Sequence, residues 1–166
     1  VVVGKVSSSY REYIVMKSVP LKNLISVANK YSSNSYAEQI LRTVGLRVYG
    51  FGSIYNSQKV LNDFVKRLFG EYYPFKLNDA CGLSTYNLLT PYMLAQTLVY
   101  AYKNHNGFNG FISTLATSGK EGTMEGRLKD ITAYAKTGTL QKVSNIAGIM
   151  ITKTGKRVAF CIMVNN

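Results

Sequence analysis

Three short polar clusters along the chain contain residue types that take part in binding and catalysis. Ser32-Ser33-Asn34 forms the first, residues 79–84 the second, and Lys136-Thr137-Gly138-Thr139 the third. A strand edge of this last type lets an extended peptide pair alongside it through main-chain hydrogen bonds, and Gly138 has no side chain to block that approach. Lys136 places a cation there, which favours an ionised or hydrogen-bonded partner. This is chemistry that would suit the binding of an extended peptide.

Lys-Thr-Gly alone has little specificity, because the chain contains it twice. Lys153-Thr154-Gly155 is the second copy, and it lies between two apolar segments. There the glycine fits a tight turn. The second copy therefore predicts a hairpin turn.

Each cluster also has an interpretation that involves no catalysis. Ser32 and Asn34 are residue types that cap helices, and Lys136 could be a solvated charge at the end of a strand. Asp79 and Ser84 are typical of residues that shape loops through their own backbone, and this is the interpretation we favour for them. The order of the clusters along the chain, rather than any one of them, favours function.

The elements that must position these clusters follow from periodicity and capping residues. Apolar spacing predicts helices over 21–30, 35–44 (stopped by Gly45), 57–69 (capped by Ser57) and 91–103 (capped by Thr90), with a short helix over 108–115. Residues 10–17, 131–136, 143–152 and 157–164 have the composition of strands, the last two joined in a hairpin. Residues 158–164 are apolar on both faces, which predicts a strand covered on both sides. The fold class is α+β, a mainly antiparallel sheet packed with helices.

Composition excludes several functional classes. With 20 Lys plus Arg against 8 Asp plus Glu, the net charge is +12, but the basic residues are spread along the chain and form no run, so we expect no nucleic-acid partner. Two Cys and one His, His105, exclude a Cys- or His-rich metal site, and we expect no cofactor; His105 has the setting of a helix-end residue. The longest apolar stretch, 158–164, falls far short of the roughly 20 residues that span a bilayer, so no transmembrane segment is expected.

The order and context of the motifs resemble the active-site serine penicillin-recognising enzymes, with Ser-x-Asn between helices and Lys-Thr-Gly-Thr on a later strand. Neighbouring residues resemble more narrowly the D-Ala-D-Ala carboxypeptidase/endopeptidase family of low-molecular-mass penicillin-binding proteins. The similarity spans roughly residues 14–165 and includes Ser18-Val-Pro-Leu, Tyr31-Ser-Ser-Asn-Ser-Tyr-Ala-Glu-Gln, Asp79-Ala-Cys-Gly-Leu-Ser, Ala135-Lys-Thr-Gly-Thr-Leu and Val158-Ala-Phe-Cys-Ile-Met-Val-Asn.

The resemblance implies a penicillin-recognising transpeptidase-like (serine β-lactamase-like) fold and a role for each motif residue. Ser32, held by Lys136, would relay a proton to the departing D-Ala amine, and Asn34 would hydrogen-bond the substrate amide. The Thr137 hydroxyl would meet the terminal carboxylate of the substrate, beside Gly138, and the Thr139 N–H would form half of an oxyanion hole. Implied partners are peptidoglycan stem peptides ending in D-Ala-D-Ala, with β-lactams as inhibitors, and an extracytoplasmic location.

The chain departs from the family pattern in two places. The family nucleophile is a Ser followed three positions later by Lys, and none of the Ser residues here has Lys at that spacing. We therefore expect residues 1–166 to be the C-terminal portion of the catalytic domain, without its nucleophile-bearing portion and inactive alone. Ala80 and Cys81 replace the usual Gly and Ser of the second motif. The alternative function is a non-catalytic, peptidoglycan-binding pseudoenzyme.

Overall fold

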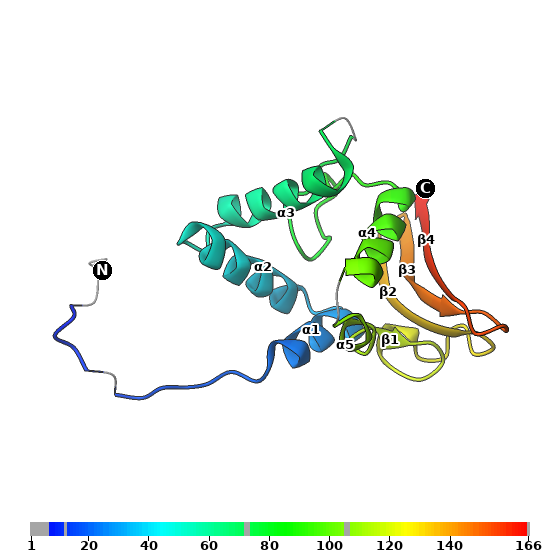
Figure 1. The fold of residues 1–166 in the computed structure, drawn as a ribbon, viewed down its shortest axis with the longest axis horizontal. Coiled ribbons are helices and arrows are strands. Elements are labelled where there is room, and N and C mark those ends of the chain that lie inside the picture. The colour runs from blue at the N-terminus through cyan, green and yellow to red at the C-terminus, as the bar shows by residue number, and fades with distance from the viewer. Residues whose placement is uncertain (1–6, 12, 72–73, 105–106, 166) are drawn as a thin grey trace.

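The computed structural model of the chain describes residues 7–11, 13–71, 74–104 and 107–165; His105 lies outside this set. Helices α1 (Leu21–Lys30), α2 (Asn34–Tyr49) and α3 (Ile54–Phe69) form one side of the molecule (Figure 1). A four-stranded sheet with α4 (Pro91–Asn104) and the short α5 (Phe108–Ile112) forms the other.

The sheet is antiparallel throughout, in the order β1-β2-β3-β4, which confirms the predicted α+β class. Its strands are β1 (Ala116–Thr117), β2 (Thr132–Leu140), β3 (Val143–Ile151) and β4 (Arg157–Asn165). The short β1 pairs only with Tyr134 and Ala135 of β2. The edge of β2 beyond Ala135 therefore has no partner strand among the described residues.

The predicted helices α1, α4 and α5 are confirmed in place, and Thr90 caps α4 by accepting the Met93 N–H at 3.2 Å. Gly45 does not stop α2. It is buried inside the helix, where an added Cβ would lie 3.2 Å from the Ser57 nitrogen, so its small size permits the close packing of α3. The helix ends instead at Gly50, in the left-handed region at φ 77°.

Helix α3 begins one turn earlier than predicted, because its cap is Ser53 rather than Ser57. The Ser53 hydroxyl accepts the Asn56 N–H at 3.0 Å. Ser57 is 3% exposed and donates its own hydroxyl proton to the Ser53 carbonyl at 2.7 Å. Two serines of cap type lie at the start of this helix, and only packing decides which of them is buried.

Strand β2 is longer than predicted, and this changes the setting of the third motif. Pairing with β3 continues through Gly138, opposite Asn145, to Leu140, opposite Val143. Lys136 to Thr139 therefore lie within a strand rather than at its end. The β3–β4 hairpin turns at residues 153–156, as predicted.

The strand predicted over residues 10–17 is wrong for the described part of that segment. It is extended but unpaired, and it leads away from the body of the molecule (Figure 1). Tyr13 is 95% exposed and Met16 is 91% exposed. The aromatic and β-branched composition favours extended backbone, but a strand also needs a neighbour to pair with.

Strand β4 is not covered on both sides, which corrects a second prediction. Helix α4 packs on one face, whereas Val158, Ile162 and Val164 on the opposite face are 40%, 56% and 55% exposed. Both faces of β4 are apolar, but the face opposite α4 would need a further layer of structure to bury it. The described residues supply such a layer only near Phe160.

The core lies on both faces of the sheet. Phe108, Ile112 and Ile149 form a cluster on the helical face, with Leu98 of α4 packed against them. On the opposite face Ala116, Met124 and Ala135 pack with Ile146 and Phe160, where Met124 comes from a 3-10 turn, η1 (Gly122–Met124). Within the described residues, no helix combines the length and apolar composition needed to cross a bilayer.

Candidate active site

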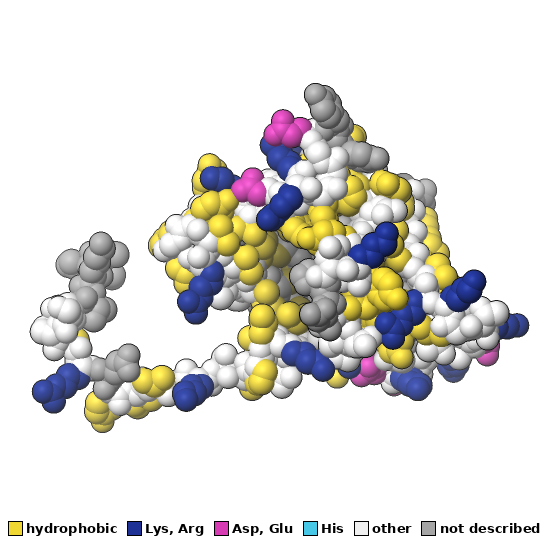
Figure 2. All heavy atoms as spheres, in the orientation of Figure 1, with side chains coloured by type: hydrophobic (Ala, Val, Ile, Leu, Met, Phe, Trp, Pro, Cys, Tyr) yellow, Lys and Arg dark blue, Asp and Glu magenta, His cyan; other side chains and the backbone are white. Residues whose placement is uncertain are grey.

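A cavity of about 470 Å³ opens between the helical side and the sheet. Figure 2 shows this face of the molecule hollowed between α2 and α4, with basic side chains scattered over it rather than gathered in one patch. All six residues singled out from the sequence line the cavity, namely Ser32, Asn34, Lys136, Thr137, Gly138 and Thr139. Residues 80–83 of the second motif line it as well.

The first and third motifs meet through a direct hydrogen bond. The Lys136 ammonium donates to the Ser32 hydroxyl oxygen with Nζ and Oγ 2.7 Å apart, although the two residues are 104 positions apart in the chain. Lys136 Nζ also donates to the Thr137 carbonyl at 2.5 Å. The Ser32 oxygen accepts this bond, so its own proton stays available to a third group in the cavity.

Ser32 lies in the short link between α1 and α2, in a conformation unusual for serine. Its φ is 55°, in the left-handed region, which costs about 1 kcal/mol or more for a residue other than glycine. The N-cap of α2 is Ser33, and no side chain caps that end. Capping therefore explains neither Ser32 nor Asn34, which is the first residue of α2.

Lys136 is held on β2 with its side chain on the face that carries α4. It pairs with Ala147 and shares that face with Tyr134, which belongs to the core cluster of α5. The side chain is partly buried, and this desolvation lowers the pKa of the Lys136 amine below the ordinary lysine value. The alternative of a fully solvated charge at a strand end is excluded by this burial and by the two hydrogen bonds.

The open edge of β2 presents main-chain groups beside the lysine. The Ala133 carbonyl accepts the Ser118 N–H at 2.9 Å across this edge. Every second residue of a strand directs its N–H and C=O groups to the same edge, so those of Thr137 and Thr139 point the same way as those of Ala133. The Thr137 carbonyl already accepts a hydrogen bond from Lys136 Nζ. Thr139 lies past the end of β1, so no strand among the described residues pairs with its main chain on this edge. Thr137 is only 7% exposed, and Gly138 and Thr139 are exposed. This edge is suited to pairing with an extended peptide.

The second motif forms a wall of the same cavity, and Asp79 shapes it as predicted. The Asp79 carboxylate accepts the N–H groups of Gly82 at 2.8 Å and Ser84 at 2.6 Å. The Ser84 hydroxyl accepts the Tyr86 N–H at 3.2 Å. Both side chains therefore serve the loop itself.

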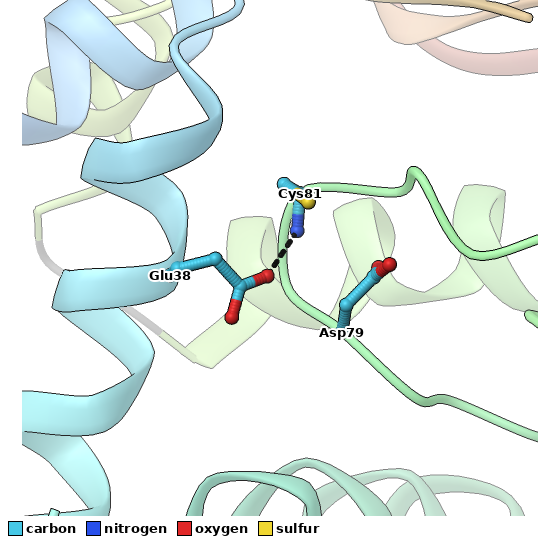
Figure 3. A group of neighbouring side chains, drawn as sticks. All are labelled: Glu38, Asp79 and Cys81. Carbon is cyan, nitrogen blue, oxygen red and sulfur yellow. Dashed lines mark hydrogen bonds between the residues drawn. The ribbon is translucent and has the colours of Figure 1, made fainter. Parts of the chain in front are cut away.

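Sequence reasoning missed Glu38, which joins this loop to α2. Its Oε1 accepts the N–H of Ala80 at 2.7 Å and the N–H of Cys81 at 3.0 Å. Figure 3 shows the second of these bonds, to Cys81. Helical spacing gave a signal, since Glu38 follows Asn34 by four positions and so shares its face of α2.

Glu38, Asp79 and Cys81 also bring three possible metal-ligand atoms within 4.8 Å of one another. The hydrogen bonds of the two carboxylates account for the cluster without an ion, since both acidic side chains hold main-chain N–H groups. Burial, as the main cause, raises the pKa of the Cys81 thiol, which favours the protonated form over the thiolate that binds metals. We assign the cluster to support of the loop.

Comparison with known proteins finds one family over the whole chain. The model of the D-Ala-D-Ala carboxypeptidase 3 (S13) family matches residues 1–166. The chain is 29% identical over 157 residues to the D-alanyl-D-alanine carboxypeptidase DacB of Haemophilus influenzae. The aligned segment covers 89% of this chain and 32% of DacB. The chain therefore spans about a third of the length of this curated relative.

Solved structures agree with the family match. Penicillin binding protein 4 (dacB) from H. influenzae, complexed with a novel beta-lactam, superposes with a TM-score of 0.77 at 29% identity, covering 88% of this chain and 35% of that one. The TLA-1 extended-spectrum beta-lactamase shares the fold at 18% identity, with a TM-score of 0.60 over 87% of this chain and 55% of that one. The fold is thus the penicillin-recognising, transpeptidase-like fold predicted from the sequence, and the chain belongs to the D-Ala-D-Ala carboxypeptidase 3 (S13) family.

Proposed function

We propose that residues 1–166 are the C-terminal portion of the catalytic domain of a serine-type D-Ala-D-Ala carboxypeptidase/endopeptidase that acts on peptidoglycan peptides. The hydrogen bond between Lys136 Nζ and Ser32 Oγ carries the proposal, because it joins two motifs at the open edge of β2. Family membership and the 29% identity to DacB support it. The nucleophilic serine stands outside this chain, since no serine here is followed by lysine at the family spacing.

The substrate strand pairs with the open edge of β2. The proton of the nucleophilic serine passes to the lysine of the Ser-x-x-Lys motif, which also stands outside this chain. The serine oxygen attacks the carbonyl carbon of the penultimate D-Ala, and the oxyanion that forms accepts the Thr139 N–H. Asn34 holds the substrate amide, and the terminal carboxylate lies near the hydroxyl of Thr137 and the ammonium of Lys136. Gly138 leaves this approach unobstructed.

Ser32 and Lys136 carry the proton. As the carbon–nitrogen bond breaks, Ser32 gives its hydroxyl proton to the departing D-Ala amine, and Lys136 returns a proton to the Ser32 oxygen. Burial assists this exchange, because a lowered pKa makes the Lys136 ammonium a stronger proton donor. The remaining ester between nucleophile and acyl group is then hydrolysed by water, and a β-lactam acylates the same serine.

Stem peptides ending in D-Ala-D-Ala are the proposed partners, and an extracytoplasmic cell-wall location follows from that substrate. The positive net charge of +12 suits a polymer that carries carboxylates.

Fluorescent penicillin tests the proposal when it is applied both to this chain and to the longer protein with its native N-terminus. We expect a covalent label on the long form alone. A label on the 166-residue chain would contradict the external nucleophile. A long form that lacks Ser-x-x-Lys, binds peptidoglycan and takes up no label would instead favour the non-catalytic binding function.

A further inference from the structure

Two parts of the cavity lining come from segments that are far apart in the sequence, so the chain itself does not fix the distance between them. Asn34 is the first residue of α2, with Ser32 in the link just before it, and residues 80–83 lie in the loop between α3 and α4. The distance between them determines how wide a group the cavity accepts. A device that fixes this distance therefore acts on recognition.

Glu38 is the contact that links the two. Its side chain extends from α2 to the main chain at Cys81, while the Asp79 side chain lies on the loop itself (Figure 3). One carboxylate oxygen accepts two consecutive N–H groups, those of Ala80 and Cys81. Charge-assisted bonds of this kind are about twice as strong as neutral ones.

The rest of the loop is organised so that this contact sets its position. Asp79 closes residues 79–84 into a rigid turn through Gly82, Ser84 and the Asn87 amide. A second side-chain hydrogen bond from the helical side comes from Gln58 of α3, which donates to the Asn78 carbonyl at 2.7 Å, before the turn begins. The turn is thus held at its base by α3 and at its tip by α2, and loss of the tip contact would leave only the contacts at its base.

We propose that Glu38 is a positioning residue of the site: its carboxylate holds the wall at residues 80–83 against α2 and thereby sets the width of the cavity that receives the substrate. This inference rests on the proposed function for its substrate. It assigns to Glu38 no contact with the substrate and no part in proton transfer.

The holding contact is tested by thiol alkylation, followed by mass spectrometry of the peptides that contain each cysteine. Cys81 lies in the wall and Cys161 lies in β4, and both line the cavity, so Cys161 is an internal reference. We expect Glu38→Ala to speed alkylation of Cys81 about tenfold or more, because the thiol loses burial and is ionised more readily. Cys161 should change by less than about twofold, because pairing with β3 holds its strand in place.

Two control variants sharpen this measurement. Glu38→Gln keeps an oxygen that accepts both N–H groups but removes the carboxylate, whose charge and hydrogen bond help to raise the pKa of the Cys81 thiol, so its rate measures that electrostatic contribution alone and should stay well below the Glu38→Ala rate. Gln39→Ala removes an exposed neighbour on the same helix and should have no effect. Equal Cys81 rates in Glu38→Ala and the native chain would overturn the proposed contact.

The effect on recognition is tested in the longer protein with two penicillins, one with a small and one with a bulky side chain. We expect Glu38→Ala to change the ratio of their acylation rates about tenfold, and Glu38→Gln to preserve it. Faster Cys81 labelling with an unchanged ratio would reduce Glu38 to a purely structural residue and overturn the inference. If the native long form takes up neither penicillin, the proposed function fails, and the substrate part of this inference with it, while the alkylation rates still decide whether Glu38 holds the wall.

Discussion

The two copies of Lys-Thr-Gly in this chain have the same sequence and opposite surroundings. Lys136-Thr137-Gly138 lies inside β2, where Lys136 is partly buried and bonded to Ser32. Lys153-Thr154-Gly155 forms the exposed tip of the β3–β4 hairpin. There Gly155 adopts φ 79° and donates its N–H to the Thr152 carbonyl at 2.9 Å.

The comparison shows that glycine serves two different physical purposes in one motif. Gly155 is needed for its backbone conformation, because a residue with a Cβ is strained at positive φ. Gly138 has ordinary strand geometry, and an added Cβ would come no closer than 3.9 Å to another atom, that of Asn145. At Gly138 the empty space beside the backbone matters, and at Gly155 the backbone angle does.

The largest expected difference between the two copies concerns the lysines. Lys136→Ala in the longer protein should slow acylation by penicillin about a hundredfold or more, because a positioned proton-transfer group contributes that much. Lys153→Ala should leave the rate within about twofold, as expected for an exposed hairpin residue. Stopped-flow or gel-based labelling measures both rates. Equal losses in the two variants would contradict the assignment of the site to the first copy.

A smaller effect is expected at Gly138. Gly138→Ala should leave thermal stability unchanged, because the added methyl meets open space. It should lower the rate of penicillin acylation about tenfold, since the methyl projects into the cavity beside the substrate strand. A calorimetric scan and the labelling rate, taken on the same preparation, separate the two quantities.

Gly155→Ala should give the opposite result. Positive φ makes alanine unfavourable by about 1 kcal/mol, which lowers Tm by about 2–4 °C in a chain of this size. The labelling rate should not change, because the turn lies away from the cavity lining. A loss of labelling without a loss of stability would show that the hairpin tip takes part in binding.

The smallest effect concerns the pH dependence of stability. Burial lowers the folded-state pKa of Lys136, so the folded state penalises its protonated form, fully at pH values below that pKa. The penalty fades as the pH rises towards the unfolded-state pKa, where the amine is neutral in both states. Lys136→Met should therefore gain stability over the native chain most at neutral pH and least at alkaline pH, as measured by denaturant unfolding.

Lys153→Met is the matched control, because it makes the same lysine-to-methionine change at an exposed position. A pH-independent difference between Lys136→Met and the native chain would show that desolvation of Lys136 does not contribute to stability.

Local patterns in the sequence were enough to predict several elements of the fold. Apolar spacing over residues 21–30 predicted α1, Thr90 predicted the start of α4, and the Lys-Thr-Gly turn at residues 153–155 predicted the last hairpin. Each rests on interactions between residues near one another in the chain, which is where propensity and capping act.

The errors share one cause, which is a partner distant in the sequence. Gly45 has the composition of a helix stop but is used for contact with α3, and β2 continues through Gly138 because β3 pairs with it. Residues 10–17 have strand composition but no strand beside them among the described residues. Propensity describes what a segment tolerates, and the neighbour decides what it becomes.

The sequence by itself determined which residues are available for chemistry and, through the order of its motifs, the family resemblance. Only the tertiary structure decided which Lys-Thr-Gly lies at the cavity, that Lys136 meets Ser32 across 104 positions, and that Glu38 joins α2 to the opposite wall. The physical reason is that a hydrogen bond needs its two atoms about 3 Å apart, and such distances between remote residues are set by packing of the whole chain.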